Sequence, residues 1–336
     1  MQTTSEPRMP TLKVDDPRPG GRRFPALEIL FVLMAAAFLG RSAIAGFVGG
    51  PQIQTWSTFF VSIALQALPF LVLGVVVSGA IAAFVPSSRL ARLLPRSPFL
   101  AVPIAGAAGG FLPGCECGSV PISAQLVRRG VSPAAALTFM LSAPAINPVV
   151  LVSTAVAFPG QPAVVLARFA ASLLTAIVVG LIWSRRRSAT AGMPVASSDE
   201  HAHGRWQTFA ETVVHDFLHA GGYLVLGAAA AATLQLVVPR DVLGSIAASP
   251  LLAVLALAVL AVVLSICSEA DAFVAASLGP FPMTAKLAFL VVGPAVDLKL
   301  IALQIGSFGR SFALRFAPLS FAVAVASAVI VGRVLL

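Results

Sequence analysis

The stretch Pro113–Gly130 reads P-G-C-E-C-G-S-V-P-I-S-A-Q-L-V-R-R-G and places two thiols and a carboxylate inside a long apolar region. Gly114 and Gly118 bracket the segment Cys115–Cys117, and neither Gly nor Pro favours a helix interior, so we expect unwound or sharply turned backbone here. In hydrocarbon, irregular backbone must be buried in protein or line a wet cavity, because unpaired polar groups are costly there. Secondary transporters build substrate sites from such broken helices, and this stretch is therefore predicted to form half of one.

The composition around this stretch is that of a polytopic membrane protein. Charged residues make up 10% of the chain and hydrophobic residues 58%, and several apolar runs reach the roughly 20 residues that span a bilayer as a helix. The net charge of +9 fits basic cytoplasmic loops, and without a nucleic-acid-binding motif it does not indicate nucleic acid as a partner. The chain has no Gly-x-x-x-x-Gly-Lys-Ser/Thr loop for ATP phosphates, and no cofactor is expected.

Hydropathy and charge predict an all-α membrane protein with five segments. We expect a disordered cytoplasmic tail over residues 1–23 and an N-terminal transmembrane span over 24–55. A first transmembrane repeat should cover 56–183, a cytoplasmic linker 184–205 and a second transmembrane repeat 206–336. The predicted spans are about Leu27–Phe47, Phe59–Val85, Pro133–Phe158, Val164–Trp183, Thr208–Val238, Thr284–Ile305 and Phe312–Leu335, with apolar segments at Phe99–Leu112 and Leu251–Ile266. Asp15 and Asp16, with no clear small-residue cleavage site after the first span, argue against a cleaved signal peptide.

Four sequence anchors recur in the same order in the two halves and indicate an internal duplication. They pair Trp56–Phe59 with Trp206–Phe209, Leu71–Gly74 with Leu224–Gly227, Cys115-Glu-Cys117 with Cys267-Ser-Glu269, and Leu137–Asn147 with Leu287–Asp297. Arginines mark the cytoplasmic ends of spans, and an arginine run precedes only the second copy. The two copies are therefore predicted to have opposite orientations, an arrangement that places a binding site near the midplane between them.

The candidate substrate-binding side chains cluster at the predicted breaks of the two copies. They are Cys115, Glu116, Cys117, Asn147, Cys267, Glu269, Asp271 and Asp297, of which Cys115, Cys117 and Cys267 are the candidate metal ligands. Thiolates suit soft or borderline ions such as Zn(II), Cu(I) and As(III), and ionisable groups inside membranes usually mark a substrate path or a proton relay. In the alternative interpretations, each cysteine is a small buried hydrophobe and Asp297 forms a structural ion pair with Lys299 or Lys286.

The three cysteines do not indicate a disulfide framework. Their number is odd, and Cys115 and Cys117 are too close in sequence to be well placed for pairing with each other. A separate polar face, formed by Glu211, His215 and His219, repeats every four residues. Two histidines four residues apart on a helix can chelate a metal, and a polar stripe at the membrane interface is the alternative that we prefer for this face.

Four motifs of the chain resemble the ArsP/YraQ-type predicted-permease family. They are Gly114–Pro121, Ser142–Pro148, Cys267–Phe273 and Gly293–Asp297, and the resemblance extends from about Trp56 to the C-terminus. The resemblance implies a transport protein of the bacterial inner membrane. Some members of that family are associated with efflux of trivalent organoarsenicals, and others with metal homeostasis, notably of zinc.

These patterns predict a secondary permease that binds a small soft or thiol-reactive solute, or a metal or metalloid ion, between two broken hairpins. Proton coupling through Glu116 or Glu269 is a hypothesis. One alternative is a membrane-embedded thiol or redox enzyme that uses Cys115 or Cys117, although no histidine accompanies these cysteines in sequence. Another is a membrane subunit that scaffolds a soluble partner, a role that does not need buried polar residues. The expected partners are membrane lipid and the solute, and the sequence identifies no partner protein.

Overall fold

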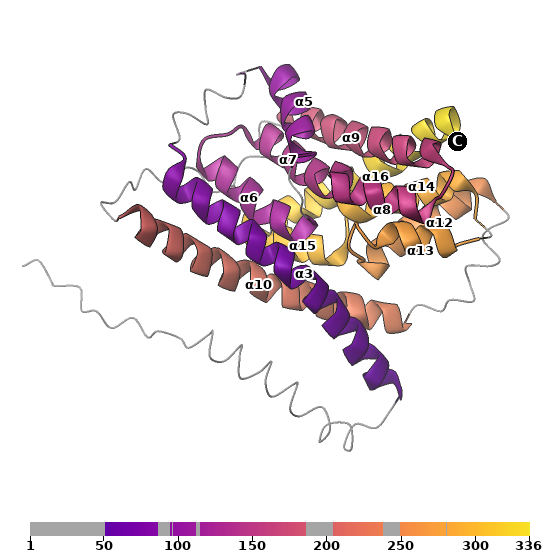
Figure 1. Ribbon diagram of the computed structural model, residues 1–336, viewed down its shortest axis with the longest axis horizontal. Coiled ribbons are helices and arrows are strands. Elements are labelled where there is room, and N and C mark those ends of the chain that lie inside the picture. The colour runs from indigo at the N-terminus through magenta and orange to yellow at the C-terminus, as the bar shows by residue number, and fades with distance from the viewer. Residues whose placement is uncertain are drawn as a thin grey trace, which may run out of the picture. The chain divides into compact units, whose positions relative to one another are not determined.

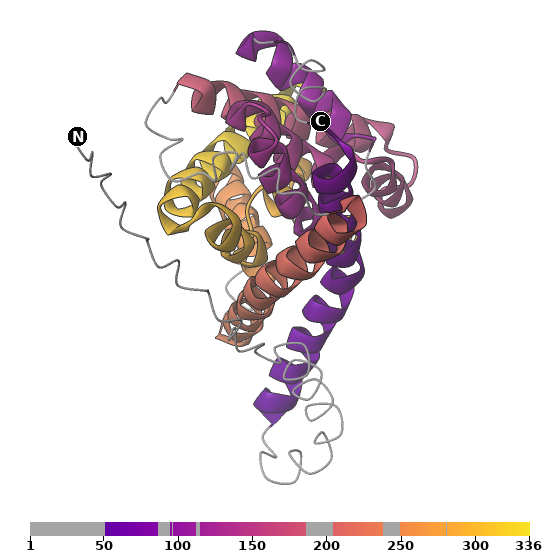
Figure 2. The ribbon, with the colours of Figure 1, turned by 90° about the vertical axis from the view of Figure 1, so that its left-hand side faces the viewer.

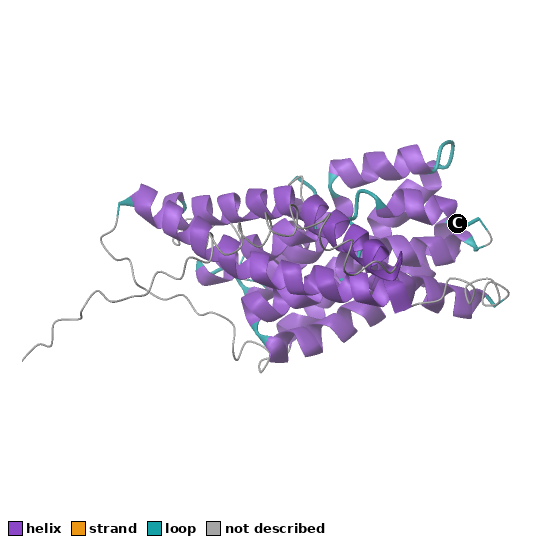
Figure 3. Cartoon of the chain, turned by 90° about the horizontal axis from the view of Figure 1, so that it is seen from below, coloured by secondary structure: helices purple, strands orange, loops and turns teal. Residues whose placement is uncertain are grey.

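The computed structural model describes residues 51–86, 95, 97–111, 115–185, 204–237, 249–279 and 281–336. These residues belong to one compact unit, Ala45–Leu336. The predicted cytoplasmic tail, nearly all of the predicted N-terminal span and most of the predicted linker lie outside the described residues. Within them every regular element is a helix and none is a strand (Figure 3), which confirms the all-α class.

The helices of the two halves follow one another in matching order (Figure 1). The first half contains α3 (Pro51–Phe84), α5 (Pro98–Gly109), α6 (Glu116–Arg128), α7 (Pro133–Ile146), α8 (Pro148–Ala157) and α9 (Pro162–Arg185). The second half contains α10 (Arg205–Val237), α12 (Pro250–Leu264), α13 (Asp271–Ser277), α14 (Met283–Ala295), α15 (Leu298–Phe308) and α16 (Arg310–Leu335). Proline opens many of these helices because its fixed φ suits the first helical position, where its missing N–H is not needed.

The packing partners of the helices also correspond between the halves. α5 packs on α7 as α12 packs on α14, and α7 packs on α9 as α14 packs on α16. The first helices of the halves, α3 and α10, lie side by side (Figure 2). Trp56 donates to Thr233 at one end of this pair and the ring of Phe84 meets Trp206 at the other, so the two helices run antiparallel.

Both predicted spans that contain the fourth pair of anchors, Leu137–Asn147 and Leu287–Asp297, are interrupted. The first consists of α7 and α8 with Asn147 between them, and the second consists of α14 and α15 with Val296 and Asp297 between them. In both, the residue that ends the break caps the following helix: the side chains of Asn147 and Asp297 accept hydrogen bonds from the backbone N–H groups of Val150 and Leu300. The repeated Pro-Ala-Ile-Asn and Pro-Ala-Val-Asp sequences thus mark helix junctions inside the spans.

These two interrupted spans lie at the centre of the bundle. Among the described residues, six stretches are long and apolar enough to cross a membrane, which agrees with a polytopic membrane protein. The most apolar windows of Pro133–Ala157 and Met283–Phe308 are each 78% buried, whereas those of the other four stretches are 28–44% buried. The interrupted spans therefore face protein, as irregular backbone in hydrocarbon requires.

Two glycines allow the long outer helices to approach this centre closely. A Cβ atom on Gly74 of α3 would overlap the backbone of Gly118 on α6, and one on Gly227 of α10 would lie 2.8 Å from the Cα atom of Lys299 on α15. Gly74 and Gly227 are the last residues of the second pair of repeated anchors. The same short sequence thus creates a close helix crossing in each half, one onto α6 and the other onto α15.

Candidate functional site

The Cys115 and Cys267 segments, which the sequence pairs across the duplication, meet in the structure but have different backbones. Cys115 occupies the N-cap position of α6, and Glu116 begins that helix. In the second half α12 ends at Leu264, Ser265 adopts a left-handed conformation with φ of 48°, and α13 begins only at Asp271. The expected irregular backbone therefore spans the second segment, whereas in the first it does not continue beyond Cys115.

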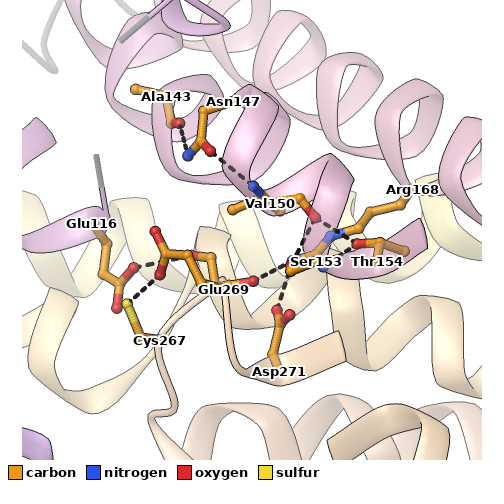
Figure 4. Close-up of polar contacts among 11 residues, drawn as sticks. Glu116, Ala143, Asn147, Val150, Ser153, Thr154, Arg168, Cys267, Glu269 and Asp271 are labelled. Atoms are coloured by element: carbon orange, nitrogen blue, oxygen red, sulfur yellow. Dashed lines mark hydrogen bonds and ion pairs between the residues drawn. The ribbon is translucent and has the colours of Figure 1, made fainter. Parts of the chain in front are cut away.

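Glu116 is a buried carboxylate that residues of the second half hold from two sides. Its side chain is about 1% exposed. The Lys299 ammonium donates to Oε1 at 2.7 Å, and the Ser268 hydroxyl donates to Oε2 at 3.1 Å. Ser268 lies 152 residues from Glu116 in sequence, so the predicted juxtaposition of the two segments is observed. Figure 4 shows Glu116 facing Cys267 and Glu269.

Cys115, Glu116 and Cys267 bring three metal-ligating groups together. One ligand atom from each lies within 4.8 Å of the others, and all three residues are buried. The Cys267 thiol donates a hydrogen bond to Glu269 Oε2 at 2.6 Å. Cys117, the remaining candidate ligand, is also buried but is not a member of this group, and all three cysteines belong to one buried cluster. Two sulfurs and a carboxylate oxygen form a donor set for soft or borderline ions.

Asp297 has two structural contacts. Its Oδ1 atom accepts from the Leu300 amide and caps α15, and its Oδ2 atom lies 3.5 Å from the Lys299 ammonium. Oδ2 has no hydrogen-bond partner among the described residues. The ion pair with Lys299 was one of the alternatives raised by the sequence, and the structure contains it. It also places Lys299 between two carboxylates, those of Glu116 and Asp297.

Arg168 on α9 is the residue that the sequence analysis missed. Its side chain is fully buried, one terminal nitrogen lies 2.8 Å from Asp271 Oδ2 and 3.0 Å from the Ser268 carbonyl oxygen, and the other donates to Thr154 (Figure 4). A charged group buried in a membrane protein needs such partners and usually has a role. Its signal was present in the sequence, because Arg168 is the only charged residue between Pro162 and Ser184.

Ser268 connects the two buried ion pairs. Its hydroxyl donates to Glu116, and its backbone carbonyl accepts from Arg168. The result is a continuous polar chain that alternates between the halves of the molecule: Asp297 and Lys299, Glu116, Ser268, Arg168, Asp271. Motion of one half relative to the other would therefore change these contacts.

Asn147 and the histidine face of α10 have further contacts of their own. The Asn147 side-chain amide donates to the Ala143 carbonyl and accepts from the Val150 N–H, and these bonds stabilise the junction of α7 and α8 (Figure 4). On α10, His219 bonds the Gly306 carbonyl at 2.9 Å, and the rings of His215 and His219 stack with centroids 6.0 Å apart. In the described part of the chain, this histidine face does not gather three ligand groups.

Comparisons with known proteins agree with a membrane permease. The ArsP_1 family model, described as a predicted permease, matches residues 52–333. The UPF0718 protein YcgR of Bacillus subtilis (strain 168) is 36% identical over 266 residues, which cover 76% of this chain and 90% of that protein. A Streptococcus mutans serotype c protein, described as a candidate subunit of a two-component membrane permease complex, is 33% identical over 281 residues, or 81% of this chain and 93% of that protein. No solved structure matches the chain.

Proposed function

The chain belongs to the ArsP_1 family of predicted permeases, and we propose that its cargo is a soft or thiol-reactive metal or metalloid ion bound by Cys115, Glu116 and Cys267. The family and the relatives identify a multi-pass bacterial membrane permease, a transporter rather than an enzyme. The proposal concerns what this permease carries and where the cargo binds.

The observation that carries the proposal is the convergence of two thiols and a carboxylate from the two halves. Their ligand atoms lie within 4.8 Å of one another, and metal bonds to sulfur and oxygen are about 2.0–2.3 Å long. A small contraction would bring all three atoms onto one ion. Thiolate ligands favour Zn(II), Cu(I) and thiophilic metalloids over hard ions such as Mg²⁺.

Binding of the cargo by Cys267 requires loss of its thiol proton, because the thiolate is the metal ligand. The Cys267 thiol already donates to Glu269. When the sulfur–cargo bond forms, the S–H bond breaks and its proton has an acceptor in the Glu269 carboxylate. We infer that Glu269, rather than the ion-paired Glu116, is the carboxylate through which proton coupling would run.

The proposed site is formed by residues from both halves of the chain. We propose that the halves are inverted repeats, with the cargo held between them while they rock about the site. The antiparallel α3 and α10 support this orientation. So does the meeting of Cys115 with its repeat counterpart Cys267 and of Glu116 with its counterpart Ser268, since residues near a two-fold axis contact their own equivalents.

Transport into proteoliposomes tests the cargo. The purified full chain is assayed with Zn(II), Cd(II), Cu(I) and As(III), alone and with Cys115→Ser, Cys267→Ser or Glu116→Gln. We expect each substitution to lower uptake about a hundredfold, because it removes one ligand atom from a three-atom site. Ser123→Ala is the matched control, since Ser123 is buried on α6 and bonds only the Ser119 carbonyl among its described contacts.

Cys117→Ser separates the two possible ligand sets. Retained uptake would assign the site to Cys115, Glu116 and Cys267, whereas loss would add Cys117 as a further ligand. Uptake that no cysteine substitution changes would contradict the proposal. The S. mutans relative is described as a subunit of a two-component complex. We infer that a second component assembles with this chain. The assay should therefore also be run on native membrane vesicles.

A further inference from the structure

The carboxylate of the proposed cargo site already holds a cation. The Lys299 ammonium lies 2.7 Å from Glu116 Oε1, and the side chains of both residues are at most 3% exposed. The other Glu116 oxygen accepts from the Ser268 hydroxyl. A positively charged cargo that approached Glu116 would therefore meet an ammonium at the same carboxylate.

A second carboxylate stands next to this ammonium. Asp297 Oδ2 lies 3.5 Å from the Lys299 nitrogen, has no hydrogen-bond partner among the described residues and is buried. Its other oxygen is fixed as the cap of α15. A buried carboxylate oxygen without a hydrogen bond is costly. Asp297 therefore offers the ammonium a second position, in which Oδ2 would gain a hydrogen bond.

We propose that Lys299 is a displaceable internal cation, whose ammonium leaves Glu116 for Asp297 when a cationic cargo binds Cys115, Glu116 and Cys267. The ammonium stays charged and only changes partner. This inference rests on the proposed function, since it assigns Lys299 a role in the same site. It also narrows the cargo to positively charged ions, because a neutral metalloid species would bind the thiols without displacing the ammonium.

The exchange follows from the electrostatics of a buried site. Two cations at one carboxylate repel each other strongly where the dielectric is low, so the cargo and the ammonium compete. An empty site without Lys299 would leave Glu116 buried and uncompensated, which is unfavourable. The lysine therefore compensates Glu116 when the site is empty, and the cargo compensates it when the site is loaded.

The moving part is the lysine side chain rather than its helix. The Lys299 backbone lies directly under Gly227 of α10, where there is no room for even a Cβ atom. The four-carbon side chain ends between two carboxylates that are both within 3.5 Å of its nitrogen. The ammonium can thus change partner by side-chain rotation alone, while α15 keeps its place.

Equilibrium binding of Cd(II) to the purified full-length protein tests the exchange. The charge-transfer absorbance of Cd(II)–thiolate bonds reports occupancy of the cysteines directly. Lys299→Met removes the competing ammonium. We expect the affinity for Cd(II) to rise by roughly tenfold or more, because no ammonium then occupies the Glu116 carboxylate in the empty site. Cd(II) transport should fall by about the same factor, since nothing replaces the cargo at Glu116 when it leaves.

A double-mutant cycle locates the effect on Glu116. In a Glu116→Gln background, Lys299→Met should leave the affinity for Cd(II) unchanged within about twofold, because the ammonium and the cargo no longer compete for a carboxylate. Lys286→Met is the control for loss of a buried lysine: Lys286 is buried on α14, and none of its described contacts joins it to the cluster. It should leave Cd(II) affinity as in the wild type.

Lys299→Arg keeps the inference testable if Lys299→Met does not fold. It preserves the charge balance, but the planar guanidinium forms two parallel bonds to a carboxylate and should hold Glu116 more firmly. We then expect weaker Cd(II) binding, by roughly tenfold. If the Lys299–Glu116 ion pair were merely structural, Lys299→Arg would leave the affinity for Cd(II) unchanged. Lys299→Met would then weaken that affinity or leave it unchanged.

The outcomes separate this inference from the proposed function. If wild-type protein shows no Cd(II)–thiolate absorbance, or if Cys115→Ser and Cys267→Ser do not change it, the proposed cargo site is wrong. If the wild type binds Cd(II) through these cysteines, the site stands. In that case, two results would overturn the displaceable cation alone. Either Lys299→Met does not raise the affinity for Cd(II), or it raises that affinity by the same factor in the wild-type and Glu116→Gln backgrounds.

Discussion

The Cys115 and Cys267 segments occupy matching places in the duplication but contribute in different ways. The first gives a helix start that fixes Glu116, whose partners come from the other half. The second gives an irregular stretch in which Cys267 bonds its own neighbour Glu269. Regular helical backbone holds a side chain in one place, whereas an irregular stretch can follow a moving ligand. The comparison suits a proposed site with one fixed and one adaptable side.

A second difference concerns charge. By the spacing of the anchors Leu137–Asn147 and Leu287–Asp297, Lys299 corresponds to Val149, and Arg168 corresponds to Pro318. The two thiols Cys115 and Cys267 thus correspond between the predicted copies, while Lys299 and Arg168 have no cationic counterpart at the matching positions. The difference teaches that the predicted repeat accounts for the paired thiols but not for the buried cations beside them.

The largest expected effect concerns the orientation of the two halves, since the result is all or none. An impermeant maleimide added from outside should label a cysteine at Gln161, which is exposed between α8 and α9, and should not label one at Ser188, next to the arginine run. The three native cysteines are buried, so the introduced thiol is the reactive one. The reverse labelling would contradict the cytoplasmic position predicted for the arginine run, and labelling of both sites from outside would contradict α9 as a membrane span.

Next in size is the loss of the buried cation of the first half. Arg168→Met leaves Asp271 and the Ser268 carbonyl without their charged partner, and we expect a destabilisation of about 3–5 kcal/mol, as for other broken buried ion pairs. Thermal unfolding in detergent measures it. Adding Asp271→Asn removes the uncompensated charge and should restore most of the stability. Equal stability of Arg168→Met and the wild type would mean that the pair contributes nothing.

A smaller effect is expected at the helix crossings that position the site. Gly74→Ala pushes α3 away from α6, and Gly227→Ala pushes α10 away from Lys299, each with an expected cost of about 1–3 kcal/mol from overpacking. Gly279→Ala is the control, because an added Cβ meets nothing within 4 Å there. If all three variants unfold at the same temperature, the close crossings do not matter for stability.

The smallest effect is expected at Ser268, which links the two ion pairs. Ser268→Ala removes one hydrogen bond to Glu116 but keeps the carbonyl bond to Arg168, so we expect a loss of about 0.5–1.5 kcal/mol in stability. Proteoliposome uptake should fall only modestly compared with Glu116→Gln. A loss as large as that of Glu116→Gln would make the hydroxyl itself a cargo ligand.

Much of this architecture was determined by the sequence alone. Apolar length predicts the spans, because a helix must cover the hydrocarbon thickness. The matched Cys115 and Cys267 segments predict that distant parts of the chain meet, and Ser268 bonds Glu116 across 152 residues. The continuous spans predicted over Pro133–Phe158 and Thr284–Ile305 needed refinement, since Asn147 and Asp297 cap new helices within them.

Only the tertiary structure decided which charges belong together. Lys299 pairs with Glu116 across 183 residues, and Arg168 pairs with Asp271 across 103. Sequence periodicity reports which face of one helix is apolar, but it contains no record of which other helix covers that face. The sequence therefore does not identify the partner of a single buried arginine or lysine. The packing of the helices does, because the partner must lie close in space and an unpaired buried charge is costly.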